Sequence, residues 1–387
     1  MPEPTDQPAP RLRIWQPMIF WTAGILPLLW AARLCAAAEE PAPDWLHTDG
    51  RWIKDGRGEV QKLYGVNTVI RLKNERAKFE AAGKQGFNTI RLMLFKQDIE
   101  KPVKDFPDQD RSGLEAIDKA VKWCQELRLR VILDQQIWGK DIEPAPTDFL
   151  TNEKQQAEWL NMWRLLVDRY KNNSTVVGID LMNEPNGLKH KMKLPASVAD
   201  PQGAWEGIAK SAIKDLKAIN PKLLFIVEDF GRTNAPNGLW RDVKFLKENN
   251  GVYSSHIYYS GHKQWNPWGK AYASGDFETG KKLLGKWLDE NYAKYTAEGV
   301  PVWMGEVGFR TDDPHWQQEM TDELQLFDER GIGYALYSYA VWPWPEPFDI
   351  VDRSAPGYQL SKVGQLFSTH VLELVKPKGD PEQRAKP

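Results

Sequence analysis

Two kinds of apolar pattern alternate along this chain. Short apolar runs of about four to eight residues, rich in β-branched and aromatic side chains, are typical of buried strands, whereas longer segments with one apolar face are typical of helices. The short runs predict eight strands, over residues 63–67, 89–94, 131–134, 176–182, 223–228, 252–259, 302–305 and 333–339. The longer segments predict helices over residues 75–83, 114–127, 153–171, 205–219, 243–248, 278–298, 316–330 and 361–375.

The regular alternation of strands and helices predicts the fold class, which is α/β with a single (β/α)8 TIM barrel. Two doubly wound domains are disfavoured, because no glycine-rich nucleotide-binding motif follows the first strand. We expect a hairpin ahead of the barrel, with one strand at residues 52–54, a turn at Asp55-Gly56 and a second strand from Val60. The prediction is therefore one barrel domain over residues 39–375 and a polar tail over residues 376–387.

The N-terminal segment has the features of an export signal. Arg11 and Arg13 precede an apolar run over residues 18–32, and three alanines at 36–38 offer a cleavage site. These features predict a signal peptide over residues 1–38 and a secreted or periplasmic protein. The alternative is an uncleaved membrane anchor, but the run is short for a membrane span and contains Pro27. Cleavage would leave Cys124 as the one cysteine of the mature chain, without a disulfide partner.

Charge and aromatic content narrow the choice of partner. The chain has 51 Lys and Arg against 53 Asp and Glu, so neither nucleic acid nor an anionic membrane surface is expected as the main partner. Tryptophan is unusually frequent, with 18 copies. Long segments follow several predicted strands and carry Trp138, Trp265 and Trp342, so aromatic rings should line the rim of the barrel, where they could stack on sugar rings or simply pack the loops.

Two glutamates stand where predicted strands end. Glu184 follows the apolar run that begins at residue 176, and Glu306 follows the run that begins at residue 302; Pro185 and Gly308 then interrupt the strand pattern. Parallel strands of a barrel end at the same rim, so we expect the two carboxylates to converge there. A pair of carboxylates suits the cleavage of a glycosidic bond, which needs one acid and one nucleophile or base.

Four short motifs occupy the second, fourth, sixth and seventh predicted strands or their ends. They are Phe-Asn-Thr-Ile-Arg-Leu at 87–92, Asn-Glu-Pro at 183–185, His-Ile-Tyr at 256–258 and Trp-Met-Gly-Glu at 303–306. In this order they resemble the motifs of glycoside hydrolase family 5, the cellulase and mannanase family of (β/α)8 barrels. The resemblance covers nearly all of the chain after the N-terminal segment.

The resemblance implies a catalytic role for each glutamate. Glu306 would be the nucleophile that attacks the anomeric carbon, and Glu184 would be the acid/base that protonates the departing oxygen and later deprotonates water. Arg91 and Tyr258 would supply the donors that keep Glu306 ionised. The less specific alternative for Glu184 is an ordinary carboxylate at the start of a loop.

The substrate-binding residues follow from the same resemblance. Asn183 would bind the sugar 2-hydroxyl, and His256 would orient the sugar, unless it is merely a hydrogen-bonded core histidine. Gln136 stands where relatives usually have histidine, and it can bind a hydroxyl without carrying charge. Trp138 and Trp342 are expected at the substrate from the loops after the third and eighth strands.

Two further features bear on the roles of individual residues. Asp134 and Asp180 lie within apolar strands and are expected to be structural, hydrogen-bonded to adjacent strands. The eighth strand has tyrosines where relatives often have tryptophan, so either Tyr337 or Trp342 would form the sugar platform, and we favour Trp342.

The resemblance therefore predicts a retaining endo-β-glycosidase that acts on a polysaccharide or oligosaccharide, most specifically β-1,4-glucan. A β-mannanase, a transglycosylase and a non-catalytic carbohydrate-binding barrel remain as alternatives. No His, Cys and Asp cluster has metal-ligand spacing, so neither a cofactor nor a metal is expected. We expect a monomer.

Overall fold

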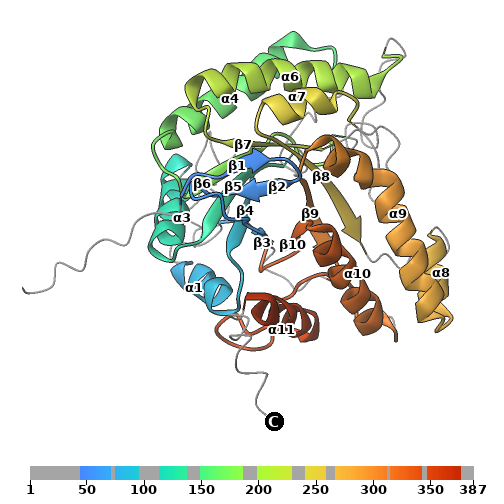
Figure 1. Cartoon of the computed structure of the whole chain (residues 1–387). Helices are drawn as coiled ribbons and strands as arrows, with labels where there is room; N and C mark the ends of the chain where they lie inside the picture. The colour runs from blue at the N-terminus through green and yellow to red at the C-terminus, as the bar shows by residue number, and fades with distance from the viewer. Residues whose placement is uncertain are drawn as a thin grey trace, which may run out of the picture. The chain divides into compact units, whose positions relative to one another are not determined.

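The computed structural model describes residues 44–70, 75–95, 113–136, 149–185, 198–228, 240–258, 266–311, 314–341 and 347–375. Within these ranges, eight parallel strands close into a barrel in the order β10-β3-β4-β5-β6-β7-β8-β9 (Figure 1). The strands are β3 Tyr64–Thr68, β4 Thr89–Leu94, β5 Arg130–Gln135, β6 Val176–Asp180, β7 Leu224–Glu228, β8 Gly251–Tyr258, β9 Val302–Gly308 and β10 Gly333–Leu336. The predicted (β/α)8 barrel is confirmed.

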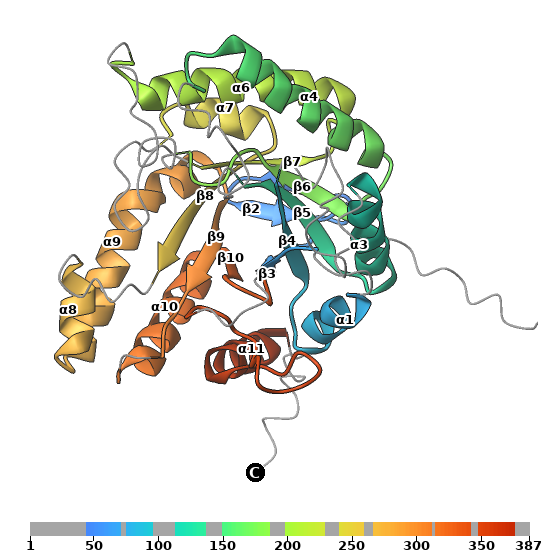
Figure 2. The same cartoon turned by 180° about the vertical axis from the view of Figure 1, so that it is seen from behind.

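Helices surround this barrel, as the views from the two sides show (Figures 1 and 2). In the described ranges they are α1 Arg76–Lys84, α3 Leu114–Glu126, α4 Glu153–Tyr170, α6 Pro201–Ile219, α7 Val243–Glu248, α8 Pro267–Ala273, α9 Phe277–Glu298, α10 Trp316–Arg330 and α11 Lys362–Val375. The sequence pattern did not predict α8, which is too short to show a helical period. This helix begins at Pro267, and the ring of its Trp268 packs 5.1 Å from that of Trp287 in α9.

The N-terminal hairpin is confirmed, but its strands pair earlier in the chain than expected. β2 (Trp52–Lys54) pairs antiparallel with β1 (His47–Asp49), and the turn contains Gly50 in the left-handed region, with φ +57°. Val60 forms only an isolated bridge with Lys54. Asp55 explains the difference. Its Oδ1 accepts hydrogen bonds from the backbone N–H groups of Arg57 and Glu59, and these bonds fold residues 55–59 into a loop.

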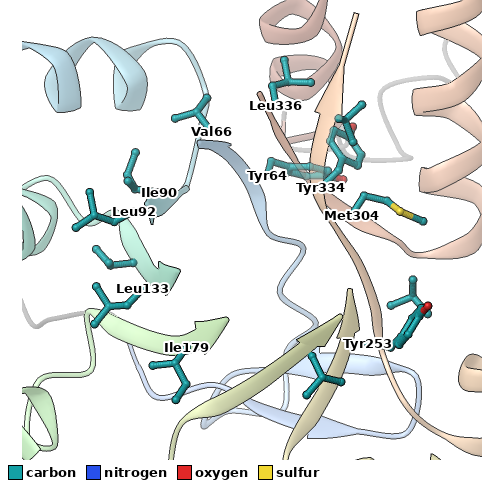
Figure 3. Packing of buried hydrophobic residues seen from close by; sticks show 14 of the residues in the cluster. Tyr64, Val66, Ile90, Leu92, Leu133, Ile179, Tyr253, Met304, Tyr334 and Leu336 are labelled. Carbon is teal, nitrogen blue, oxygen red and sulfur yellow. The ribbon is translucent and has the colours of Figure 1, made fainter. Parts of the chain in front are cut away.

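The barrel strands bury both faces, and the two faces differ. Outward-facing residues such as Val66, Ile90 and Ile179 join the large apolar cluster that includes the surrounding helices (Figure 3). A smaller cluster inside the barrel includes Ile132 and Leu224, together with residues of the hairpin. Because side chains alternate along a strand, residues two or four positions further on point into the same interior, and there the sequence changes from apolar to charged.

Several predictions concern segments that lie outside the described residues. These are the signal peptide over residues 1–38, the polar tail over residues 376–387, and the three rim tryptophans Trp138, Trp265 and Trp342. In the part of the chain that the structure describes, no helix combines the length and apolarity needed to cross a membrane. Cys124 is a buried free thiol in α3.

Candidate active site

Arg91 lies at the centre of the charged end of the barrel. It is completely buried, and carboxylates from four other strands surround its guanidinium group. Nη2 lies 3.0 Å from Asp134, 2.9 Å from Asp180 and 3.1 Å from Glu228. Nη1 lies 2.8 Å from Oε1 of Glu306. All four acids stand near the carboxyl ends of their strands with side chains turned inward, so the barrel geometry gathers them around one cation.

This cluster is held together by charge. Burial alone would lower the pKa of Arg91, but its carboxylate neighbours, led by Asp134 and Asp180, raise that pKa well above its ordinary value. Burial also raises the pKa of Asp134 to about 7, although the Arg91 charge opposes this effect. The same two causes act on Asp180, whose pKa is raised well above its ordinary value. Both aspartates are completely buried and form ion pairs with Arg91, which supports the structural role expected for them.

A β-bulge in β9 turns Glu306 into the interior. His256 of β8 pairs with Glu306, whereas the residue before His256 pairs with Met304, so Gly305 is an extra residue in β9. The register between β9 and β10 shifts at the same place. Met304 and Val307 both join the outer apolar cluster, so two residues lie between these outward-facing positions instead of one. The bulge is what allows a glutamate at this position to face inward.

Glu306 receives the donors that the sequence predicted. Its Oε1 accepts from Arg91 Nη1, and its Oε2 accepts from the hydroxyl of Tyr258. Burial and the Glu306 charge raise the pKa of Tyr258 well above its ordinary value, so the phenol keeps its proton and remains a donor. Two donors, one of them cationic, therefore hold the Glu306 carboxylate in place.

Glu184 lies just beyond β6, on the turn before Pro185. Its backbone is in the left-handed region, with φ +44°, and its side chain is 25% exposed, in contrast to that of Glu306. Its Oε1 lies 3.0 Å from Nδ1 of His256, and the same nitrogen lies 3.6 Å from Oε2 of Glu306. The predicted convergence of the two glutamates is therefore present, with His256 between them.

His256 is buried among carboxylates. Its Nε2 lies 3.0 Å from Oε1 of Glu228, an ion-pair distance without the alignment of a good hydrogen bond. Burial alone would lower the pKa of His256, but the charges of Glu228 and Glu306 raise it well above its ordinary value. The imidazole is thus favoured as a cation that lies between Glu184 on one side and Glu228 on the other.

Two predicted binding residues border this centre. Oδ1 of Asn183 accepts from Arg91 Nη2 at 3.0 Å, which fixes the amide and leaves its NH2 group as the donor that a sugar hydroxyl could meet. Nε2 of Gln136 donates to Oδ2 of Asp134 at 2.6 Å, so the residue that replaces the expected histidine is tied to the buried cluster. Both side chains are nearly buried. The ring of Tyr337 packs edge-on against that of Tyr258.

Sequence reasoning missed two residues of the centre, Glu228 and Asn67. Glu228 ends β7 and contacts both Arg91 and His256. Asn67, near the end of β3, accepts from Arg91 Nη1 at 2.9 Å and donates to the carbonyl of Gly305, also at 2.9 Å. The signal for Glu228 was available, because it is a charged residue at the end of a predicted apolar strand, as the other two glutamates are.

Among the described residues, Glu184, His256 and Glu306 form the one group of three that places a ligand atom each within 4.8 Å of one another. These atoms are already paired with one another, and Glu306 is also paired with Arg91 and Tyr258. Hydrogen bonding and ion pairing therefore account for the grouping, and the absence of a metal requirement stays a prediction.

Comparison with protein families supports the sequence resemblance. The family model described as cellulase (glycosyl hydrolase family 5) matches residues 52–341. An endoglucanase of Paenibacillus polymyxa is 26% identical over 301 residues, which cover 70% of this chain and 72% of that protein. Endoglucanase B of Acetivibrio thermocellus is 25% identical over 340 residues, which cover 71% of this chain but only 60% of the relative.

Solved structures show the same fold. A β-glucanase of Saccharophagus degradans in complex with cellotetraose superposes with a TM-score of 0.61 at 18% identity, over 87% of this chain and 96% of that chain. A hyperthermophilic endocellulase of Pyrococcus horikoshii has a TM-score of 0.61 at 18% identity, over 86% of this chain and 99% of that chain. At this level of identity the likeness concerns the barrel alone.

Proposed function

Because the chain belongs to glycoside hydrolase family 5, and is therefore an O-glycosyl hydrolase, we propose that it cleaves β-1,4-glucan internally and with retention of configuration. The observation that carries this proposal is the position of Glu184 and Glu306 on either side of one histidine nitrogen, 3.0 Å and 3.6 Å from it. One carboxylate is buried and held by donors, and the other is partly exposed.

The closeness of the two carboxylates supports retention. One oxygen of Glu184 and one of Glu306 lie within 4.8 Å of each other. Retaining glycosidases keep their carboxyl groups about 5–5.5 Å apart, whereas inverting enzymes separate them by about 6.5–9.5 Å to admit a water molecule. Two carboxylates that share one nitrogen leave little room for that water, so direct attack by Glu306 is the favoured first step.

In this first step, Glu306 attacks the anomeric carbon and forms a glycosyl-enzyme ester as the bond to the leaving sugar breaks. Glu184 transfers its proton to the departing glycosidic oxygen, so that the sugar leaves as an alcohol. Arg91 and Tyr258 hold and orient the Glu306 carboxylate until it reacts. The NH2 group of Asn183 would donate to the 2-hydroxyl as positive charge develops on the ring.

In the second step, Glu184 is a carboxylate and takes a proton from water, which attacks the same anomeric carbon. The ester bond to Glu306 breaks and its carboxylate returns to Arg91 and Tyr258. Two inversions at one carbon give net retention. The partial exposure of Glu184 fits this role, because the acid/base must meet both the leaving group and water.

The choice of β-1,4-glucan rests on the relatives, which are named endoglucanases. Purified protein should be assayed on carboxymethyl-cellulose, mixed-linkage β-glucan and mannan, with Glu306→Gln as the inactive control. Internal cleavage predicts that viscosity falls faster than reducing ends appear, and retention predicts that the β-anomer appears first in the proton NMR spectrum of the products. Turnover of mannan and of neither glucan would identify the protein as a β-mannanase. Products longer than the substrate in the mass spectrum would indicate transglycosylation.

We also propose that the mature enzyme is exported after loss of residues 1–38, on the strength of the sequence pattern alone. N-terminal sequencing of protein recovered from the periplasm or medium should begin at Glu39. Recovery of the full-length chain in the membrane fraction would instead favour an uncleaved anchor.

A further inference from the structure

We propose that Glu228 is a positioning residue of the active site, which holds the backbone of Glu184 and keeps His256 charged and oriented toward the Glu184 carboxylate. This inference rests on the proposed catalytic roles of Glu184 and Glu306. It adds a third glutamate to the site. Among the contacts of the described residues, none joins the Glu228 side chain to the side chain of Glu184 or Glu306. Glu228 therefore acts through the backbone of Glu184, through His256 and through Arg91.

The carboxylate of Glu228 makes three contacts with the centre. Its Oε2 accepts from the backbone N–H of Glu184 at 2.9 Å. Its Oε1 lies 3.0 Å from Nε2 of His256 and 3.1 Å from Nη2 of Arg91. The Glu228 side chain is only 5% exposed, so these contacts are little screened by water. One buried carboxylate therefore links the acid/base, the histidine and the central arginine.

The contact with Glu184 bears on its backbone. A φ of +44° is uncommon for a residue with a β-carbon and persists only where the surroundings hold it. The hydrogen bond from the Glu184 N–H to an ionised carboxylate is of the stronger, charge-assisted kind. Since this turn directs the Glu184 side chain toward Glu306, loss of the bond should misplace the acid/base.

The contact between Glu228 and His256 favours the protonated, cationic form of the imidazole. The groups that face its ring are Glu184 from the turn after β6, Glu228 from β7 and Glu306 from β9. Nδ1 faces the Glu184 carboxylate and Nε2 faces the Glu228 carboxylate, and only the protonated imidazole carries an N–H toward both. Burial opposes this cation, and the charges of Glu228 and Glu306 outweigh that effect in the pKa of His256.

A charged His256 assists Glu184 during the reaction. When Glu184 has given its proton to the leaving oxygen, it becomes a carboxylate, and the N–H at Nδ1 of His256 is 3.0 Å from its Oε1 to stabilise that charge. Glu184 and His256 then titrate as a coupled pair. Removing the negative charge of Glu228 should lower the apparent pKa of this pair, because deprotonation becomes easier when a nearby anion is lost.

The first test is Glu228→Gln, which keeps the shape of the side chain and removes its charge. We expect kcat/KM to fall about 10²-fold, as for a misplaced catalytic group. The basic limb of the pH profile of kcat/KM should move down by about one pH unit. The matched control is Glu206→Gln, the same change at a buried carboxylate that accepts from Gln202 and from the backbone of Arg241 rather than from the cluster around Arg91, and it should leave that limb in place. A Glu228→Gln profile that superposes on that of the wild type would overturn the proposal.

A second variant and a second readout guard against misfolding and inactivity. Glu228→Asp keeps the charge, but its side chain is one methylene too short to reach Glu184 and His256 together. It should therefore lower kcat and leave the basic limb of the pH profile in place. A kcat equal to that of the wild type would count against the proposal. The imidazole nitrogen NMR signals of His256, assigned by comparison with His256→Asn and followed across pH, should change from those of the cation to those of the neutral ring at a lower pH in Glu228→Gln than in the wild type. The same pH dependence in both proteins would overturn the inference. This measurement needs no substrate, so it can be made even if the protein turns over no glycan. A lack of turnover would count against the proposed function and not against the role of Glu228.

Discussion

Gly305 lies so close to His256 that a β-carbon at residue 305 would come within 3.2 Å of the imidazole Nε2, and within 2.7 Å of the Ser254 hydroxyl. The second distance is shorter than real contacts allow, so the buried Ser254 hydroxyl would have to rotate away to admit the new carbon. The bulge that turns Glu306 inward therefore favours glycine at its extra residue, which also leaves the space in which His256 stands.

Gly305→Ala should accordingly displace His256 and the neighbouring Glu306. We expect kcat/KM to fall about 10- to 100-fold, since displacement of a catalytic group by about 1 Å costs that much. Gly207→Ala in α6 is the matched control, because nothing lies within 4 Å of a β-carbon there, and it should match the wild type in activity. Full activity of Gly305→Ala would show that the bulge has room to relax.

The roles of Glu306 and Glu184 can be separated by small anions. Glu306→Ala should lose activity by at least about 10⁴-fold and regain part of it with azide, which would attack the opposite face and give an α-glycosyl azide. Glu184→Ala should stay active on a substrate with a good leaving group such as dinitrophenolate, which needs no proton, and azide should yield the β-glycosyl azide. Product NMR distinguishes the two anomers, and the reverse pattern would exchange the two assignments.

The strands and the positions of Glu184 and Glu306 could be predicted because both depend on local sequence. An apolar run marks a buried strand, and the residue that follows it in a parallel barrel must lie at the rim, which places Glu184 and Glu306 at one end of the molecule. Arg91 could be assigned to Glu306 on the same reasoning, and the structure bears this out at 2.8 Å.

What could not be predicted depends on contacts between distant strands. Asp134, Asp180 and Glu228 meet one guanidinium only because the barrel closes, and no local pattern says which inward acid reaches Arg91. The bulge at Gly305 is a register shift between neighbouring strands, which a period-2 pattern in one strand does not encode. Helix α8 was missed for a simpler reason, since its seven residues give fewer than two helical turns.

The central arginine should dominate the stability of the barrel end. Arg91→Met would leave buried carboxylates without their cation, and breaking buried ion pairs from one side typically costs about 3–5 kcal/mol. Arg164 is a matched control, because it pairs with Asp215 at 2.6 Å while 44% exposed, and Arg164→Met should cost no more than about 1 kcal/mol. Urea unfolding followed by tryptophan fluorescence would measure both values. Equal losses for the two variants would mean that water reaches the cluster around Arg91.

Burial raises the pKa of Asp134 to about 7, and this shift predicts how the free energy of unfolding changes with pH. The unfolded chain loses this proton near pH 3.9, so between about pH 4 and 7 the folded protein holds a proton that the unfolded chain has released. The contribution of Asp134 to the free energy of unfolding is therefore fully present below about pH 4, and it is lost as the pH rises through about 7. Asn is neutral throughout.

Asp134→Asn should consequently gain on the wild type as the pH rises. The difference in the free energy of unfolding between the two proteins should shift in favour of the variant from pH 5 to pH 8, by a few kcal/mol at most, since one pKa unit corresponds to about 1.4 kcal/mol. Urea midpoints at pH 5, 6.5 and 8 would give this difference directly, with the pH dependence of the groups outside the cluster around Arg91 cancelling between the two proteins. A difference that stays constant across this range, or that shifts toward the wild type, would mean that Asp134 is ionised beside Arg91 throughout, with the Arg91 charge outweighing burial.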